Sequence, residues 1–205
     1  VIPALIAAST ATEVKIKSLP ELIEYGRKNP GKLNYSSAGV GSYPHYDAAL
    51  FAKRAGFEAV HVPTRAGAAG MITDMMTGQV HWGFINAASS MPVIQSGQLT
   101  PLAVITDKRL PELPNVPTVA ELGFPGAGTF NWQGLYAAAA TPPEVLQTLS
   151  KAVGDAMATP AVKAAFEKAS ITADPTASLD EARRWMQREI ELWKKTTEES
   201  GVTVN

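Results

Sequence analysis

The sequence contains no cysteine, and its 205 residues carry a formal net charge of only -1. The lack of cysteine excludes disulfide bonds, thiolate metal sites and cysteine nucleophiles. The near-zero charge provides none of the basic surface typical of proteins that bind nucleic acid, so we expect no nucleic-acid partner. No apolar run approaches the ~18 residues of a membrane-spanning helix, and we expect no direct insertion into a membrane.

The residue types that most catalytic and metal sites use are scarce and scattered. His45, His61 and His81 have neither helical i, i+4 spacing nor another metal-like spacing. No Gly-x-Ser-x-Gly sequence indicates a serine hydrolase, and the carboxylates form no obvious acid–base pair. No Gly-Lys-Ser/Thr sequence follows the glycine-rich loop, and Pro44 stands where a dinucleotide fingerprint needs glycine. We therefore expect no catalytic residues, no metal, no cofactor and no enzymatic activity.

The sequence does contain a core and a regular pattern. Hydrophobic residues make up 45% of the chain and charged residues 18%, values typical of a globular protein. Short apolar runs alternate with amphipathic stretches, as in βαβ units with right-handed crossovers. The expected strands are residues 1–8, 33–36, 59–62, 80–85 and 102–106. The expected helices are residues 18–28, 44–54, 67–77 and 88–96.

The second part of the chain has a different character. Four prolines make residues 110–126 an irregular connection, within which a short helix is expected at 119–122. Residues 130–138 have the pattern of a strand that returns along the sheet. Three further helices are expected, at residues 143–157, 160–169 and 179–200. In the last of these, we expect the buried side to be marked by Trp185, Ile190, Trp193 and the following Val202.

A glycine-bearing loop joins the second expected strand to the helix that follows it. Backbone N–H groups at such a junction lack partners within the helix, and the helix dipole favours an anion there. Glycine lets the backbone approach a ligand closely, while the serine hydroxyls and a histidine add donors. The candidate ligand-binding residues of this loop are Ser37, Ala38, Gly39, Gly41, Ser42 and His45. A Gly-x-Gly sequence after a strand is equally typical of a simple turn, and both interpretations stay open.

Two more strand ends carry candidate ligand-binding residues. Open α/β sheets bind ligands outside the carboxyl ends of their strands. The turn Thr64–Gly67 follows the third expected strand, and its Arg65 is suited to pair with a carboxylate. A solvated loop arginine is the competing interpretation. Asn86 ends the next strand, where its amide can donate to a ligand at the same edge.

These loops belong to a set of segments whose residues, and whose order along the chain, are similar to those of one known family. The set starts at Lys32–Gly39, continues through Gly41-Ser42 and His45, and ends at Thr141-Pro142. The segments between are Val60–Pro63, Gly78–Val80, Leu102–Val104 with Arg109, Leu113–Gly123 and Trp132–Leu135. In these segments the chain resembles the receptors of tripartite tricarboxylate transporters, also called the Bug family, over most of its length.

The resemblance implies an α/β fold of the type II periplasmic-binding-protein kind, in which two lobes close over a carboxylate. On that pattern, residues 13–130 form the second lobe, with a parallel-type sheet flanked by helices. Residues 1–12 are the end of the first lobe or a hinge strand. Residues 131–205 are the returning hinge strand and the C-terminal helices that belong to the first lobe. Family members have a sizeable N-terminal portion ahead of these residues, so we expect this chain to hold one side of the cleft and to bind weakly alone.

Three positions depart from the pattern of the family. Residues 8–13 are shorter than the corresponding segment in other members. Thr64 and Arg65 stand where members usually have an aromatic residue and a lysine. Asn86 stands where an aspartate is common, which argues against a ligand that bears an amino group.

The function that the resemblance implies is that of a periplasmic solute-binding receptor. Such a receptor captures a small di-, tri- or aromatic carboxylate for uptake and delivers it to a membrane transporter complex. A ligand-sensing regulatory module is the alternative, although no DNA-binding helix pair is visible. An α/β transferase that uses the same anion loop is a weaker alternative, because an acid–base pair is lacking.

Overall fold

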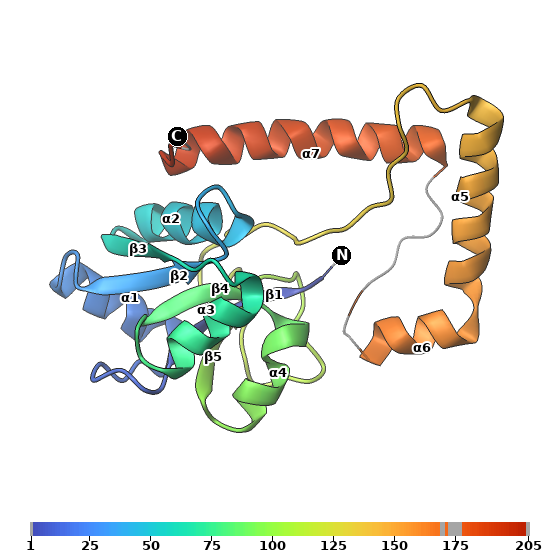
Figure 1. Ribbon diagram of the computed structural model, residues 1–205. Coiled ribbons are helices and arrows are strands. Elements are labelled where there is room, and N and C mark those ends of the chain that lie inside the picture. The colour runs from blue at the N-terminus through green and yellow to red at the C-terminus, as the bar shows by residue number, and fades with distance from the viewer. Residues whose placement is uncertain (1, 169–170, 172–177, 204–205) are drawn as a thin grey trace.

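The fold is seen in a computed structural model, which describes residues 2–168, 171 and 178–203. An α/β lobe is followed by a long connection and three helices (Figure 1). The strands are β1 (Ala4–Ser9), β2 (Leu33–Ser37), β3 (Ala59–Pro63), β4 (Trp82–Asn86) and β5 (Leu99–Val104). The helices of the lobe are α1 (Leu19–Lys28), α2 (Tyr43–Ala55), α3 (Gly67–Met76) and α4 (Ala87–Gln95). The strand–helix alternation expected from the sequence is therefore confirmed.

The five strands form one mixed sheet in the order β3-β2-β4-β1-β5. Strand β2 pairs in parallel with β3 and β4, as expected for βαβ units. Strand β1, in contrast, runs antiparallel to both of its neighbours, β4 and β5. The sheet is therefore mixed: the parallel pairing expected from the sequence holds for β2, β3 and β4, and β1 adds two antiparallel ladders.

Strand β1 lies in the interior of the sheet, and every residue from Ala4 to Ala8 is fully buried. The sequence analysis assigned residues 1–12 to the end of the first lobe or to a hinge strand. That boundary does not separate β1 from the sheet. Only Ile2, just before β1, pairs with the segment that leaves the lobe, through an isolated bridge to Asn131. The division of the chain into parts of two lobes stays a prediction.

Both faces of the sheet are covered by helices, which gives the lobe two cores. Side chains alternate between the faces along β1, as they do along any strand. Ile6 faces a core that helices α1 and α2 complete, mainly through Leu22 and Phe51. Leu5 faces a second core, which α3 and α4 complete. The methionines of α3 belong to this second core: Met71 and Met75 are buried in it and Met76 packs against it.

The connection that leaves the lobe contains less regular structure than the sequence suggested. Residues 119–122 form hydrogen-bonded turns and not a helix. The strand expected at residues 130–138 is also absent, apart from the bridge at Asn131. Residues 133–140 are exposed, and the structure places no neighbouring strand beside them. A strand needs a hydrogen-bonding partner, which explains why the favourable pattern does not form one here.

The three C-terminal helices are α5 (Pro143–Ala158), α6 (Pro160–Lys168) and α7 (Leu179–Ser200). Helices α5 and α6 stand apart from the sheet, whereas α7 runs back to α2 (Figure 1). Trp193 packs edge-on against Tyr46 of α2, with ring centroids 5.9 Å apart. Trp185 meets Trp132 of the connection instead. The expectation that Ile190 lies on the buried side is wrong, since it is 58% exposed.

A buried carboxylate holds the departing segment against α2. Asp47 is 1% exposed, and its Oδ2 atom accepts hydrogen bonds from the backbone N–H (2.8 Å) and the hydroxyl (3.1 Å) of Thr129. Its Oδ1 atom is buried and has no partner. Burial raises the pKa of Asp47 to about 7, although the two bonds from Thr129 act in the opposite direction. This contact fixes the point at which the chain leaves the lobe.

The raised pKa of Asp47 predicts a pH-dependent stability. Between about pH 4 and pH 7 the folded protein keeps a proton that the unfolded chain has lost, so the free energy of unfolding falls as pH rises. Asp47→Asn removes this titration, and we expect its stability relative to wild type to improve by roughly 2–4 kcal/mol across that interval. Urea unfolding at several pH values measures the effect. Asp107→Asn, at an exposed position, is the control, and an Asp47→Asn curve parallel to wild type would contradict the prediction.

Candidate anion-binding site

The candidate site lies at one edge of the sheet. Because β2, β3 and β4 run in the same direction, their carboxyl ends, at Ser37, Pro63 and Asn86, share that edge. Helices α2, α3 and α4 each begin just after one of these ends. We call the loop Ser37–Ser42, the turn Thr64–Gly67 and Asn86 together the rim. The structure thus brings together all the ligand-binding candidates that the sequence indicated.

Three helix N-termini at the rim have no capping side chain. The N-cap residues of α2, α3 and α4 are Ser42, Ala66 and Asn86, and none makes a side-chain cap bond. None of the three helices has an acidic residue in its first turn. In α1 and α7, by contrast, a serine caps the helix and acidic residues follow. The positive dipole ends of these helices are therefore not neutralised by their own side chains, which favours an anion there. Some N–H groups at the rim already have acceptors within the protein, among them those of Gly41, Ser42 and Ala87.

Hydrogen bonds within the loop Ser37–Ser42 stabilise its conformation. Gly39 and Gly41 have φ angles of 124° and 80°, which are strongly unfavourable for other residues. The hydroxyls of Ser37 and Ser42 lie 3.0 and 2.7 Å from the carbonyl oxygen of Gly39, to which they donate. The sequence analysis expected these hydroxyls to be donors to a ligand. In the structure the two hydroxyls stabilise the loop through the Gly39 carbonyl. Their contact with a ligand stays a prediction.

Two histidines stack beneath this loop. The rings of His45 and His61 are 3.7 Å apart and nearly parallel, at 11°. His45 accepts a hydrogen bond at Nδ1 from the N–H of Gly41 (3.2 Å), and Nε2 of His61 lies 2.6 Å from the hydroxyl oxygen of Ser37. Burial, followed by the neighbouring His45, lowers the pKa of His61 to about 4, and burial also lowers the pKa of His45. The pair is therefore neutral at physiological pH and supports the loop without adding charge.

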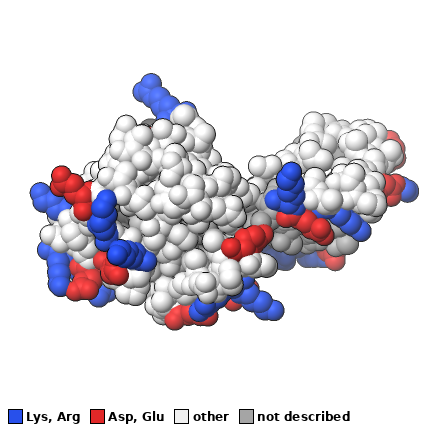
Figure 2. Space-filling view, turned by 90° about the horizontal axis from the view of Figure 1, so that it is seen from below, with Lys and Arg blue, Asp and Glu red and all other residues white. Residues whose placement is uncertain are grey.

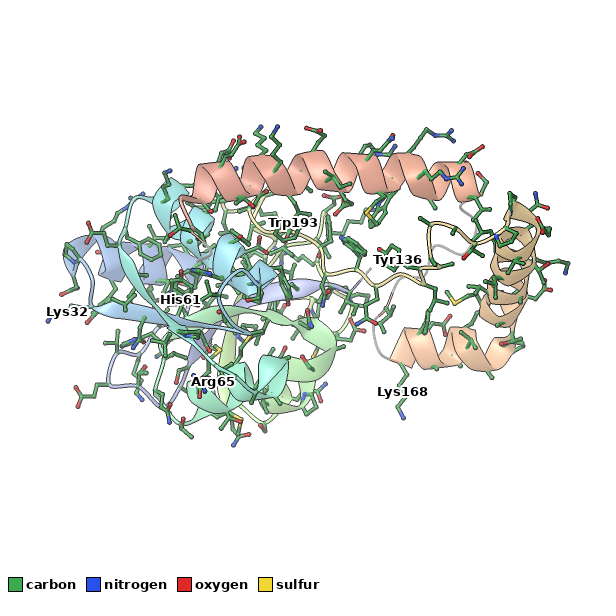
Figure 3. The ribbon with its side chains drawn as sticks, turned by 45° about the horizontal axis from the view of Figure 1, so that its top comes forward. Lys32, His61, Arg65, Tyr136, Lys168 and Trp193 are labelled. Carbon is green, nitrogen blue, oxygen red and sulfur yellow. The ribbon has the colours of Figure 1, made fainter. Side chains whose placement is uncertain are left out.

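The turn after β3 approaches α3 closely. Thr64 donates its N–H to the carbonyl of Ser37 (2.9 Å), and its hydroxyl accepts from the N–H of Ala66 (3.3 Å). A Cβ atom at Gly70 would lie 2.3 Å from the Thr64 hydroxyl oxygen, so only glycine permits this approach. Arg65 is exposed and belongs to none of the ion pairs found among the described residues. Figure 3 shows it on the same lobe as His61.

Asn86 is joined to two residues that the sequence analysis did not identify. Its Oδ1 atom accepts a hydrogen bond from the hydroxyl of Tyr43 (2.6 Å) and a longer one from Nδ2 of Asn131 (3.4 Å). Tyr43 is the first residue of α2, and Asn131 lies in the segment that leaves the lobe. Only the position of Tyr43 at the start of a rim helix could have indicated a role for it.

Charged side chains leave the middle of one face of the lobe bare. Figure 2 shows a broad uncharged area there, with charged side chains toward one end of the lobe, at its upper and lower margins and on the C-terminal helices. Among the described residues, no three histidine or carboxylate side chains gather closely enough to hold a metal ion. None of the described helices combines the length and apolar character of a membrane span.

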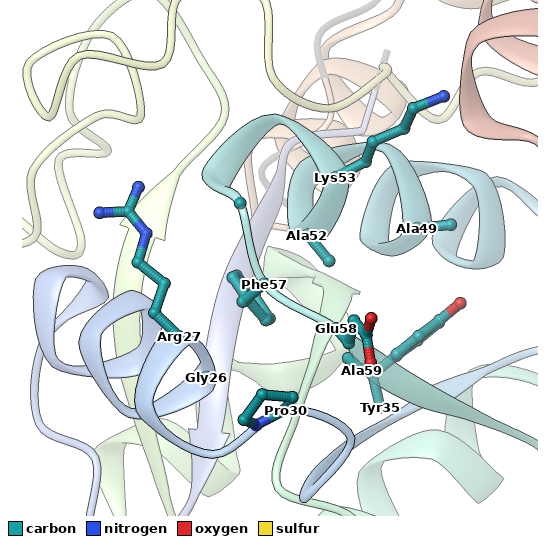
Figure 4. Close-up of a pocket in the computed structure, with 11 residues that line it drawn as sticks. Gly26, Arg27, Pro30, Tyr35, Ala49, Ala52, Lys53, Phe57, Glu58 and Ala59 are labelled. Atoms are coloured by element: carbon teal, nitrogen blue, oxygen red, sulfur yellow. The ribbon is translucent and has the colours of Figure 1, made fainter.

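A cavity of about 720 Å³ lies at the opposite end of the sheet from the rim (Figure 4). Its walls include Gly26 and Arg27 near the end of α1, Lys53 near the end of α2, and Ala59 at the start of β3. Helix carboxyl ends present carbonyl oxygens and the negative end of the dipole, which do not favour an anion. The rim, not this cavity, is therefore the candidate site.

Several known proteins are similar to this chain. A UPF0065 protein encoded in the tcbD-tcbE intergenic region of Pseudomonas sp. (strain P51) is 31% identical over the whole chain, which spans 62% of that protein. Protein BugT of Bordetella pertussis is 30% identical over 94% of the chain, which corresponds to 58% of BugT. The chain thus spans about three fifths of the length of these relatives.

Solved structures have the same fold. R. palustris Rpa4515 with adipate has a TM-score of 0.86 and 32% identity, over 98% of this chain and 66% of that one. The periplasmic binding protein BugD has a TM-score of 0.87 at 24% identity, over 98% of this chain and 67% of BugD. The fold is therefore that of the type II periplasmic binding proteins.

The family profile that matches the chain covers residues 4–202 and is described as that of the tripartite tricarboxylate transporter family receptor. The match includes the complete rim and extends through α7. Together with the relatives and the fold, it leads to one conclusion: the chain belongs to the tripartite tricarboxylate transporter receptor family.

Proposed function

We propose that this protein is a periplasmic receptor that captures a small organic carboxylate for uptake by a membrane transporter complex. The observation that carries the proposal is the convergence of three uncapped helix N-termini at the rim. A carboxylate placed there receives backbone N–H donors and three positive dipole ends without needing a buried cation. The adipate bound to the 32% identical R. palustris protein supports a ligand of this class.

A receptor fits the rim better than a catalyst does. The serine–histidine contact of Ser37 and His61 resembles part of a nucleophilic pair. However, the hydroxyl of Ser37 lies equally within bonding distance of Gly39, and Ser37 is fully buried. A nucleophile has to reach its substrate, so this contact is better suited to holding the loop. We propose that no covalent step occurs and that the ligand is released unchanged.

The rim supplies one side of a binding cleft. Its loop and turn are open to solvent, with Ala38, Val40 and Arg65 exposed. High-affinity sites bury most of the ligand surface. We propose that the opposite side comes from the first lobe, to which α5, α6 and the outer part of α7 belong, and that the two lobes close over the carboxylate. A regulatory module with the same cleft is the alternative, which a transport assay with and without the receptor gene distinguishes.

Calorimetric titration of the full-length protein tests the function. Acetate, succinate, adipate, citrate and benzoate represent mono-, di-, tri- and aromatic carboxylates. We expect at least one of them to bind with a dissociation constant of roughly 1 μM or below, which corresponds to about 8 kcal/mol. If the folded protein gives no heat of binding with any of the five, the carboxylate-receptor proposal is wrong.

Gly41→Val is expected to weaken carboxylate binding at least tenfold. Valine strongly disfavours the φ angle of 80° found at this position, so the loop must rearrange and move its N–H groups. Gly97→Val is the matched control, because Gly97 has a similar φ of 74° but lies in the turn between α4 and β5. Both variants should lose stability, but only Gly41→Val should lose affinity. Equal affinities of the two variants would exclude the loop from the site.

Arg65→Ala is expected to have a smaller effect than Gly41→Val. The side chain is exposed, so its attraction for an anion is screened by solvent. We expect a loss of about 1.5 kcal/mol at most, the lower limit for a charged hydrogen bond. Titration at low and high salt measures it, with exposed Arg188→Ala of α7 as the control. A loss beyond about 3 kcal/mol would make Arg65 a principal ligand contact.

A further inference from the structure

One hydrogen bond joins two of the helix N-termini at the rim. The hydroxyl of Tyr43, the first residue of α2, donates to Oδ1 of Asn86 at 2.6 Å. Asn86 is the N-cap residue of α4, and asparagine is among the residues that cap helices best. Here its side chain makes no cap bond and turns to Tyr43 instead. The N–H groups at the start of α4 are thereby left without a side-chain cap.

The same contact determines how the Asn86 amide is oriented. A carboxamide oxygen accepts hydrogen bonds and its nitrogen only donates them. In the structure Oδ1 of Asn86 accepts from both the Tyr43 hydroxyl and Nδ2 of Asn131. The NH2 group then occupies the other end. It donates to no atom among the described residues and is not a buried polar group without a partner, so it is open to solvent.

Tyr43 is well suited to hold this orientation. Burial, followed by the neighbouring Asp47, raises the pKa of Tyr43 above its ordinary value. The hydroxyl therefore keeps its proton over the whole physiological pH range and stays a donor. Asp47 lies one helical turn further along α2, and its bonds to Thr129 hold the departing segment that carries Asn131. The two donors on Asn86 are thus both anchored through α2.

We propose that Tyr43 is a positioning residue that turns the NH2 group of Asn86 toward the ligand and so makes the receptor select against ammonium groups. The proposal rests on the proposed carboxylate-receptor function and specifies its substrate class. The dipole of α4 and the Asn86 NH2 group favour a ligand group that accepts hydrogen bonds, although the N–H of Ala87 itself donates to the carbonyl of Pro3. A ligand group next to them has to accept hydrogen bonds, as a carboxylate, carbonyl or hydroxyl does. An ammonium group has only donors and meets the positive end of the α4 dipole, so it is rejected.

Adipate and 6-aminohexanoate are matched probes, because they have similar lengths and differ at one end in a carboxylate or an ammonium group. Calorimetric titration of the full-length protein gives the ratio of their affinities. We expect wild type to bind adipate at least 100-fold more tightly. Tyr43→Phe removes only the hydroxyl and frees the amide to rotate, so the ratio should fall at least tenfold. Tyr25→Phe, which removes a hydroxyl from α1 away from the rim, should keep the wild-type ratio.

Asn86→Asp tests the same idea from the opposite direction. The Tyr43 hydroxyl can still donate to one carboxylate oxygen, and the other oxygen replaces the NH2 group at the rim. This variant should bind 6-aminohexanoate more tightly than adipate. An unchanged ratio in both Tyr43→Phe and Asn86→Asp would overturn the proposal. A wild type that binds adipate without preferring it to 6-aminohexanoate would also overturn it, while leaving the carboxylate-receptor function intact.

A measurement without ligand decides the orientation even if adipate does not bind. In the NMR spectrum of wild type, the Asn86 side-chain NH2 protons should exchange rapidly with water and show no strong nuclear Overhauser effect to the Tyr43 ring. A strong effect to that ring would mean that the amide is turned the other way, and the proposal would fall. Failure to bind any carboxylate, with the expected amide orientation, would instead refute the proposed function alone.

Discussion

The whole lobe depends on one strand, β1, being paired on both edges. Its hydrogen bonds to β4 and β5 close the middle of the sheet, and its side chains enter both cores. Without it, β5 would have no neighbour, and the β3-β2-β4 unit would end in an open edge at β4. The rim depends on β1 indirectly, because β4 carries Asn86 at its end and the backbone of Ala87 donates to Pro3, just before β1. The position of the rim is therefore determined by the central strand of the sheet.

The sequence predicted the elements well where the signal was local. The helices expected at residues 18–28 and 44–54 form as α1 and α2. Ser18 caps α1 with Glu21 in its first turn, and Gly56 ends α2 with a positive φ. The direction of β1 could not be predicted, because the apolar pattern of a buried strand does not indicate whether it pairs in parallel or antiparallel with its neighbours. The strand expected at 130–138 did not form, because its pattern requires a partner strand. The prediction that Ile190 is buried was wrong because α7 contacts α2 through other residues, Trp193 and Glu199, and leaves Ile190 exposed. Errors thus arose where the outcome depends on contacts between distant segments.

The candidate site shows the same division. Glycines after a strand and the starts of helices are visible in sequence, and the rim residues were identified on that basis. The partners of these residues were not, since Tyr43, Asp47, Thr129 and Asn131 act through contacts that no spacing reveals. His45 and His61 were noted in the sequence, but their stacking as an uncharged pair was not predicted. The side chains of the rim therefore mainly hold its backbone in place through contacts that the sequence does not reveal.

The bridge between Ile2 and Asn131 means that the chain enters and leaves the lobe at one point. All five strands and both cores lie between these two residues, apart from the later docking of α7 on α2. During synthesis on the ribosome, the lobe has all its strand partners once residue 131 has emerged. Folding of the sheet can then precede the appearance of α5, α6 and α7, and α7 docks on the preformed surface of α2. The long connection after residue 131 allows that order, because its exposed backbone does not constrain when the last helix arrives.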